Sequence, residues 1–301
     1  MLDISVCLCT FRRPVQLDQL LGRLAEQTLQ PVEIVVVDND PGHSAREVLQ
    51  VWADRLPLRI VHQPEPNIAL ARNAAVGAAQ AHWLALIDDD ELPGADWLEQ
   101  LARTQSAGDA DGVMAPVVPT YTEATPAWMR QGGFFDRPRH VSGTVIGLPD
   151  SRTGNVLLRA AMVRSLKPPF DPEFGRSGGE DTLFFAHLHR AGYRFVWCDE
   201  AVVSEEVPAQ RSTTQWLLRR AYRGAQTYVR VSLHGVQGRR RLQRMLYLGG
   251  RALLQLALAL LLALLSWPWS RVRAFNWWRT AAAQLGKLTA LVGGRYLEYR
   301  S

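Results

Sequence analysis

Most of the first 90 or so residues alternate between short apolar runs, each the length of one strand, and segments with leucine or alanine at helical spacing. Apolar runs of this length are typical of parallel strands that are buried on both faces. The four runs occupy residues 4–10, 32–37, 58–61 and 83–87. Their β-α-β-α-β order predicts an α/β fold with a Rossmann-like, mostly parallel sheet flanked by helices.

Three later segments complete this prediction. We expect residues 69–81 and 181–191 to form helices, and residues 195–203 to form the strand that closes the sheet. Residues 119–153 are rich in proline, glycine, tryptophan and arginine, so we expect them to form substrate loops.

Acidic residues follow two of the predicted strands. Asp38 ends the run 32–37, and Asp88, Asp89 and Asp90 follow the run 83–87. Ligands of open α/β sheets bind beyond the carboxyl ends of the strands. Three adjacent carboxylates repel one another unless a cation or hydrogen-bond donors compensate, and oxygen ligands select hard cations such as Mg²⁺ or Mn²⁺. The sequence therefore predicts a divalent metal site at this edge, with an acidic surface loop as the alternative.

Two other acidic positions have a capping role as their alternative. Asp38 either accepts hydrogen bonds from a base or ribose or caps the next turn. Glu180 and Asp181 follow Gly178-Gly179 at the start of a predicted helix, where they either cap the helix or supply a base for an acceptor hydroxyl. The first strand is not followed by Gly-x-Gly-x-x-Gly, which argues against a dinucleotide cofactor.

Charge is divided unequally along the chain. Residues 209–301 hold 16 of the 34 basic residues and one of the 29 acidic residues, Glu298. A basic tail of this kind binds nucleic acid or anionic lipid. The same tail contains 19 consecutive uncharged residues at 252–270, which favours anionic membrane lipid and no nucleic acid.

We therefore divide the chain into a catalytic domain at 1–213, basic amphipathic interfacial helices at 214–245 and a hydrophobic membrane-associated tail at 246–301. The run at 252–270 is near the minimum length for a membrane span, and Trp267, Trp269, Trp277 and Trp278, at its end and just after it, resemble an interface belt. Basic residues flank it on both sides, so the positive-inside rule gives no orientation. A shallow or hairpin insertion and a buried core helix are the alternatives.

The sequence resembles the inverting family 2 glycosyltransferases of GT-A fold, and among them the bacterial exopolysaccharide glucosyltransferases of the succinoglycan type. The resemblance extends over residues 4–230 or so. The matching blocks are ISVCLCTFRRP, EIVVVDNDP, NIALARNAA, WLALIDDDE and GGEDTLFFAHLHRAGYRFVWCDEAVVSEEVP.

The resemblance implies roles for individual residues. Those of the nucleotide-sugar pocket would be Thr10, Arg12, Asp38, Arg72, Asp88 and Asp89. Asp90 would be the main ligand of Mn²⁺ or Mg²⁺. Asp181 would be the catalytic base, and Glu180 would support it or orient the acceptor.

The chain departs from the family pattern in two places. Many members have a metal-binding histidine after the last core strand, and here Glu205 is the candidate for that role. Processive synthases carry Gln-x-x-Arg-Trp on an interfacial helix, whereas this chain has arginines at 219, 220 and 223, so we do not expect processivity. Those arginines either neutralise the leaving diphosphate or contact lipid headgroups.

These observations predict a glycosyltransferase that moves a sugar from a nucleotide-sugar donor, with UDP-sugars as the family expectation, to a glycan or lipid-linked oligosaccharide. The start of the chain does not read as a secretory signal and the cysteines suggest no disulfide framework, so we expect the enzyme at the cytoplasmic face of the inner membrane. The alternatives are a sugar-phosphate nucleotidyltransferase, which would need a glycine-rich loop where residues 9–14 have no glycine, and a non-catalytic membrane scaffold.

Overall fold

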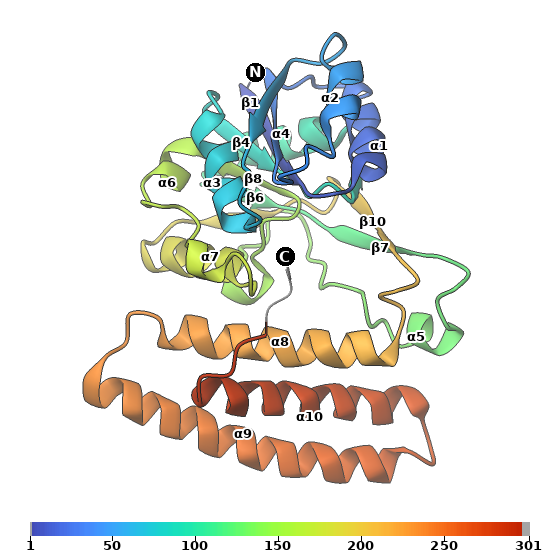
Figure 1. Cartoon of the computed structure of the whole chain (residues 1–301), viewed down its shortest axis with the longest axis vertical. Helices are drawn as coiled ribbons and strands as arrows, with labels where there is room; N and C mark the ends of the chain where they lie inside the picture. Colours follow the sequence, from blue (N-terminus) through green and yellow to red (C-terminus); the bar gives the residue numbers. More distant parts are fainter. Residues whose placement is uncertain (1, 297–301) are drawn as a thin grey trace.

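The structure, a computed structural model, describes residues 2–296. Residues 297–301 of the predicted tail, with Glu298, lie outside the described part. Within it, a mixed α/β domain is stacked on a layer of three long helices (Figure 1).

A seven-stranded sheet with the order β3-β2-β1-β4-β8-β6-β9 forms the centre of the α/β domain. Strands β1 to β4 are mutually parallel, as predicted, and lie at Ile4–Thr10, Glu33–Asp38, Leu58–His62 and Trp83–Leu86. The remaining strands are β6 (Gly112–Met114), β8 (Val156–Arg159) and β9 (Phe195–Trp197). Strand β8 runs antiparallel to both of its neighbours, so the sheet is mixed.

Alternate residues of the central strands are buried on opposite faces of the sheet. In β1, Val6 and Leu8 pack on one side, and Cys7 packs on the other. The first side is covered by α1 (Pro14–Ala25), α2 (Arg46–Trp52) and α4 (Trp97–Ala107). The second side is covered by α3 (Ile68–Ala78), α6 (Ala160–Arg164) and α7 (Glu180–Arg190). Burial on both faces explains why these strands are continuously apolar in the sequence.

The prediction of one strand at 195–203 is wrong. The chain leaves the main sheet after β9, turns through Asp199 and Glu200, and enters a second sheet as β10 (Val203–Val207). In this sheet β10 lies between β5 (Glu91–Pro93) and β7 (Val117–Tyr121). Hydrogen bonds to the side chain of Asp199 hold the turn between the two strands. The Asp199 carboxylate accepts one from the indole N–H of Trp197 and one from the Arg139 guanidinium. The pairing of β5 with β10 brings Glu205 opposite Glu91.

The segment 119–153 is largely irregular, as expected, but it includes the end of β7, the short helix α5 (Ala127–Gln131) and the 3-10 turns η1 (Leu148–Asp150). A further turn, η2 (Pro172–Phe174), precedes α7. Met129 of α5, together with Phe134 and Phe135 just after the helix, packs against Leu217 and Phe275 of the helical layer. This aromatic cluster joins the two parts of the molecule.

The helical layer consists of α8 (Thr214–Leu233), α9 (Gly238–Ser266) and α10 (Arg271–Leu291). Helix α8 faces the α/β domain, α10 packs along α8, and α9 is the outermost of the three (Figure 1). Helix α9 runs through the predicted boundary at 245/246, so the interfacial and hydrophobic segments of the tail are not separate elements. Among residues 2–296 it is the one helix long and apolar enough to cross a membrane, and 22% of its apolar window is buried.

Candidate active site

A cavity of about 310 Å³ opens where β1 and β4 end and where α3 and α7 begin, with α8 along one side. It gathers residues that lie more than 200 positions apart in the chain. Those used below are Thr10, Arg13, Arg72, Asp88, Asp89, Asp90, Arg137, Glu180, Glu205, Arg211, Arg220 and Arg223. The position agrees with the rule that ligands bind beyond the carboxyl ends of parallel strands.

The three adjacent aspartates sit in a turn that hydrogen bonds hold in place. The backbone N–H of Asp88 donates to Glu91 Oε2 at 3.0 Å, and Glu91 is buried. The Thr10 hydroxyl donates to Asp89 Oδ2 at 2.9 Å, and Arg13 donates to both Asp89 and Asp90 at 2.8 Å. Burial raises the pKa of Asp89 to about 6, against the opposing effect of Arg13. Asp89 is therefore a buried support of the turn, while Asp88 is nearly half exposed to the cavity.

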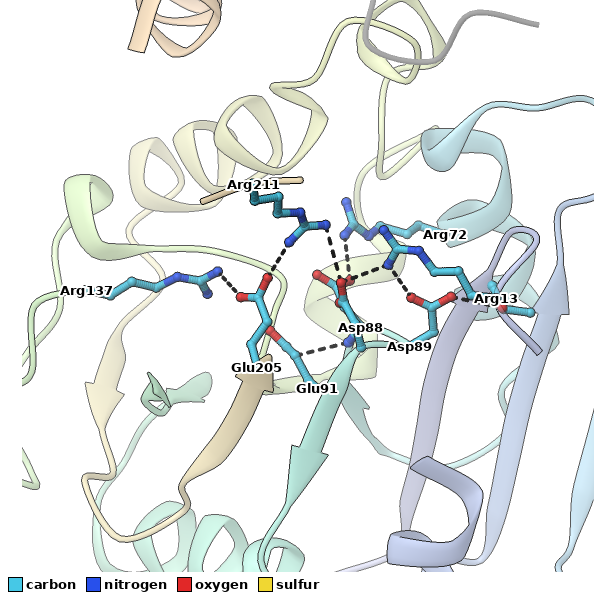
Figure 2. A network of polar contacts seen from close by, with 10 residues as sticks. Arg13, Arg72, Asp88, Asp89, Glu91, Arg137, Glu205 and Arg211 are labelled. Atoms are coloured by element: carbon cyan, nitrogen blue, oxygen red, sulfur yellow. Dashed lines mark hydrogen bonds and ion pairs between the residues drawn. The ribbon is translucent and has the colours of Figure 1, made fainter. Parts of the chain in front are cut away.

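Arginines supply the counter-charge that the acidic cluster requires. Arg211 donates to Glu205 Oε1 at 2.7 Å and lies 3.5 Å from Asp90 Oδ2, and Arg137 donates to Glu205 Oε2 at 2.8 Å. Figure 2 shows Arg211 between Glu205 and the aspartate turn, with Arg13 and Arg72 on the other side of that turn. Repulsion between neighbouring carboxylates can be relieved by a cation or by hydrogen-bond donors. The arginines supply such donors in this cavity.

Arg72 links the aspartate turn to the start of α7. Its guanidinium donates to Glu180 Oε1 at 2.5 Å and to Asp88 Oδ1 at 3.0 Å. Burial raises the pKa of Glu180, and Arg72 opposes that rise. Asp88 and Glu180 hold the pKa of Arg72 above its usual range despite burial. Glu180 Oε2 is buried and has no hydrogen-bond partner among the described residues, so this carboxyl has an acceptor atom available.

Asp181 lies one residue further along α7. Its Oδ1 accepts hydrogen bonds from the backbone N–H of Thr182 at 2.6 Å and from the Thr182 hydroxyl at 3.2 Å. Asp181 is partly exposed, whereas Glu180 is buried and lines the cavity. Glu180 is among the residues that line the cavity and Asp181 is not, so the role of Asp181 as base and the division of roles within the pair stay predictions.

Asp38 and Arg12 lie beside the cavity and not among its lining residues. Asp38 is buried, and its carboxylate accepts from the backbone N–H groups of Asp40 and Ala45. This is the capping role that the sequence left open, so contact with a donor base stays a prediction. Arg12 is 64% exposed and pairs with Asp40 at 3.0 Å, which keeps it outside the cavity.

Glu205 is paired with two arginines in the structure, and its role as a metal ligand stays a prediction. Both of its carboxylate oxygens are engaged by arginines, so a cation could use them only after Arg137 or Arg211 has moved. Asp88 and Asp90 do line the cavity, and their oxygens suit a hard divalent cation. Within residues 2–296, no three histidine, cysteine, aspartate or glutamate side chains form a ready metal cluster. The residues fit a cation that arrives with its own phosphate ligands.

Sequence reasoning missed Arg13, Arg137 and Arg211 as site residues. Arg137 and Arg211 lie in irregular segments, where an arginine has no spacing pattern to distinguish it from a solvated one. Arg13 could have been predicted, because it lies next to Arg12 in one of the blocks that carry the family resemblance.

The profile of the family described as Glycosyl transferase family 2 matches residues 5–167. The chain is also 33% identical to the succinoglycan biosynthesis protein ExoM of Rhizobium meliloti, over 99% of this chain and 95% of that protein. The chain belongs to glycosyl transferase family 2. This finding removes the nucleotidyltransferase alternative.

Other relatives of this family 2 glycosyltransferase are more distant. It is 23% identical to the glucosyl-dolichyl phosphate glucuronosyltransferase of Haloferax volcanii, over 73% of this chain and 74% of that protein. The mannosyltransferase PcManGT of Pyrobaculum calidifontis, solved with GDP-Man and Mn²⁺, superimposes with a TM-score of 0.61 at 17% identity, over 97% of this chain and 88% of that one. TarS of S. aureus in complex with UDP-GlcNAc gives a TM-score of 0.57 at 16% identity, over 93% and 90% of the two chains. These likenesses confirm a GT-A-like fold.

Proposed function

We propose that this family 2 enzyme transfers a sugar, with inversion, from a nucleotide-sugar donor to a glycan or lipid-linked acceptor in bacterial exopolysaccharide synthesis. The observation that carries the proposal is the convergence of Asp88, Asp90, Arg72 and Glu180 in one cavity at the strand ends. The part that ExoM plays in succinoglycan biosynthesis supports the pathway class, and the complexes of TarS and PcManGT support a nucleotide-sugar donor. UDP is the expected nucleotide.

The arrangement suits a single displacement at the anomeric carbon. Asp181 accepts the proton of the acceptor hydroxyl as that oxygen attacks, and Glu180, fixed by Arg72, orients the acceptor beside it. Negative charge develops on the departing diphosphate, and Arg211, Arg220 and Arg223 line the same cavity. Burial lowers the pKa of Arg220 to about 10, which leaves it cationic at neutral pH. Thr10 and Arg72 hold the walls of the donor pocket.

A divalent cation, Mn²⁺ or Mg²⁺, would be held by Asp90 with help from Asp88, and it would supply further charge neutralisation to the diphosphate. Glu205 would join these ligands only by releasing Arg211.

Product stereochemistry tests this proposal. A donor whose sugar is α-linked to the nucleotide should give a β-linked product, because one displacement inverts the anomeric carbon once. The measurement is the anomeric ¹H coupling of the first-formed product by NMR. Retention of configuration would contradict the single displacement, and failure of every nucleotide sugar to react would favour the non-catalytic scaffold.

We further propose that the enzyme works at the cytoplasmic face of the membrane, with α9 in contact with anionic lipid. Helix α9 begins with a basic cluster that includes Arg239, Arg240 and Arg244. Its large apolar side chains that stay exposed are Leu242, Leu246, Tyr247, Leu253, Leu254, Leu258, Leu260, Leu261, Leu264 and Leu265. Trp267 and Trp269 follow and are 67% and 86% exposed. Because α9 packs lengthwise on α10 and α10 on α8, this arrangement favours insertion in the membrane plane over a separate span.

Replacing Leu254, Leu261 and Leu265 together with serine should weaken binding to vesicles of phosphatidylglycerol and phosphatidylcholine by 10-fold or more, an order-of-magnitude figure from the lost apolar contact. These side chains are exposed, so the fold should be retained. The matched control replaces Val15, Val51 and Val141, exposed residues of the α/β domain, with serine. Co-sedimentation measures both variants, and equal binding would remove α9 as the membrane contact.

A further inference from the structure

A second cavity, of about 270 Å³, lies between the end of α8, the start of α9 and the end of α10. Three arginines line it, Arg230, Arg241 and Arg295, together with His234 and one carboxylate, Glu173. Within residues 2–296, none of the three guanidiniums forms an ion pair with a carboxylate. Arg230 donates to the carbonyl of Glu173 and Arg241 to that of Leu233, so their polar partners here are neutral. A cavity with an excess of unpaired cationic groups is suited to an anion.

Helix α8 connects this cavity to the active site. Arg220, Arg223, Thr227 and Arg230 recur at helical spacing and so lie along one face of α8. Arg220 and Arg223 line the active-site cavity, and Arg230 lines the second cavity. At 1.5 Å per residue, Arg223 and Arg230 are roughly 10 Å apart along the helix. That separation is comparable with the length of a short oligosaccharide.

The loop at residues 175–179, which leads into Glu180 and Asp181 at the start of α7, lies between the two cavities. Arg230 donates to the Ser177 hydroxyl, and Thr227 donates to the carbonyl of Gly178 at 3.4 Å. A Cβ atom at Gly179 would collide with the Thr227 methyl group, so α8 lies directly on this loop. A ligand that reaches from the second cavity along α8 therefore passes the segment that leads into Glu180 and Asp181.

The second cavity also borders the apolar side of the helical layer. Arg241 lies in the first turn of α9, and the next residue, Leu242, is 57% exposed. Leu246, one turn further, is 68% exposed. An amphipathic ligand could place an anionic head among the arginines and leave its apolar chain on α9.

We infer that the cavity lined by Arg230, Arg241 and Arg295 binds the phosphate or diphosphate group of a lipid-linked acceptor whose sugar extends along α8 to the catalytic acids. This inference rests on the proposed function, selects the lipid-linked acceptor of its two alternatives and adds the site that binds the acceptor's phosphate. On this view the basic face of α8 binds two groups. Arg220 and Arg223 bind the leaving diphosphate of the donor, and Arg230 binds the phosphate of the acceptor.

The test measures binding of farnesyl diphosphate, in detergent micelles, to the full chain with UDP at saturating concentration to fill the donor pocket. Arg295→Gln and Arg241→Gln should each weaken binding by about 10-fold or more, as expected for loss of a charge-assisted hydrogen bond. The matched control is Arg273→Gln, the same charge change at the opposite, exposed end of α10, which should bind within about twofold of the wild type. Arg230 is left intact because it also holds Ser177.

Two further binding measurements distinguish a lipid-linked diphosphate from free pyrophosphate and from an ordinary lipid headgroup. Inorganic pyrophosphate should show the same ranking of variants with weaker binding, since it lacks the apolar chain. Phosphatidylglycerol vesicles should bind all variants nearly alike. If the pocket variants lose vesicle binding and keep farnesyl diphosphate binding, the cavity holds an ordinary lipid headgroup and the inference is overturned.

Donor hydrolysis by the same preparations separates this inference from the proposed function. If the wild type cleaves a nucleotide sugar while Arg295→Gln and Arg241→Gln bind farnesyl diphosphate like the wild type, the acceptor site is wrong and the glycosyltransferase assignment stands. If the wild type cleaves none, the glycosyltransferase assignment fails, and an acceptor site falls with it whatever the cavity binds.

Discussion

Replacing Asp181 with asparagine should lower turnover by about 10²–10⁴-fold while leaving donor affinity nearly unchanged. Asparagine keeps the size and shape of the side chain, and its amide oxygen can still accept from the N–H of Thr182. It lacks the basicity needed to take the acceptor proton. The measurement is steady-state turnover with saturating acceptor, together with donor binding by calorimetry.

Glu180→Gln is the comparison for this prediction. Glu180 is buried against Arg72, so the amide would weaken that ion pair and disturb acceptor orientation. We expect a rise in the acceptor KM and a smaller loss of kcat than for Asp181→Asn. Near-normal turnover of Asp181→Asn, with Glu180→Gln as the inactive variant, would transfer the role of base to Glu180.

Asp90→Ala should abolish cation-dependent donor binding. Asp90 is paired with Arg13 at 2.8 Å and with Arg211 at 3.5 Å, and we expect the cation and the diphosphate to exchange with these contacts. The change should reduce Mn²⁺ binding in the presence of UDP, measured by electron paramagnetic resonance, as well as turnover. Asp96→Ala is a suitable control, because Asp96 is an exposed acid that lies outside the cavity.

Undiminished turnover in excess chelator would contradict the metal prediction. The structure specifies what would then compensate the diphosphate, namely the arginines at 13, 211, 220 and 223 that line the cavity. Loss of donor binding in Arg211→Gln, combined with indifference to chelator, would assign the charge compensation to these side chains.

Strands β1, β2 and β4 could be predicted from the sequence because burial on both faces produces continuous apolar runs, whereas β3 lies at the sheet edge and is largely exposed. The run at residues 4–10 corresponds to β1 residue for residue. Strands β5 and β6 are three residues long, too short for a periodic signal. Strand β9 begins at the predicted residue 195 but ends after three residues, and β10 carries Glu205 and Glu206 in its centre. The sequence does not reveal that antiparallel β8 lies between β4 and β6 in the sheet. Neither neighbour directly precedes or follows β8 along the chain in a hairpin, so only the folded structure shows the pairing.

The acidic residues of the site were more predictable than its arginines. Asp88 to Asp90 and Glu180 are anchored to the ends of regular elements, so a strand-end rule or a helix-start rule finds them. Arg137 and Arg211 reach Glu205 from irregular segments, and only the folded structure brings those contacts together. For the same reason the sequence could not show that two arginines compete with a metal ion for Glu205.

The most direct test of the central claim is release of nucleoside diphosphate from a panel of UDP-, GDP- and dTDP-sugars by the full-length protein in detergent with Mn²⁺. The account predicts that at least one donor is cleaved, and that Asp90→Ala cleaves it far more slowly than the wild type and the Asp96→Ala control. Absence of cleavage across the panel, or equal rates in all three proteins, would contradict the account.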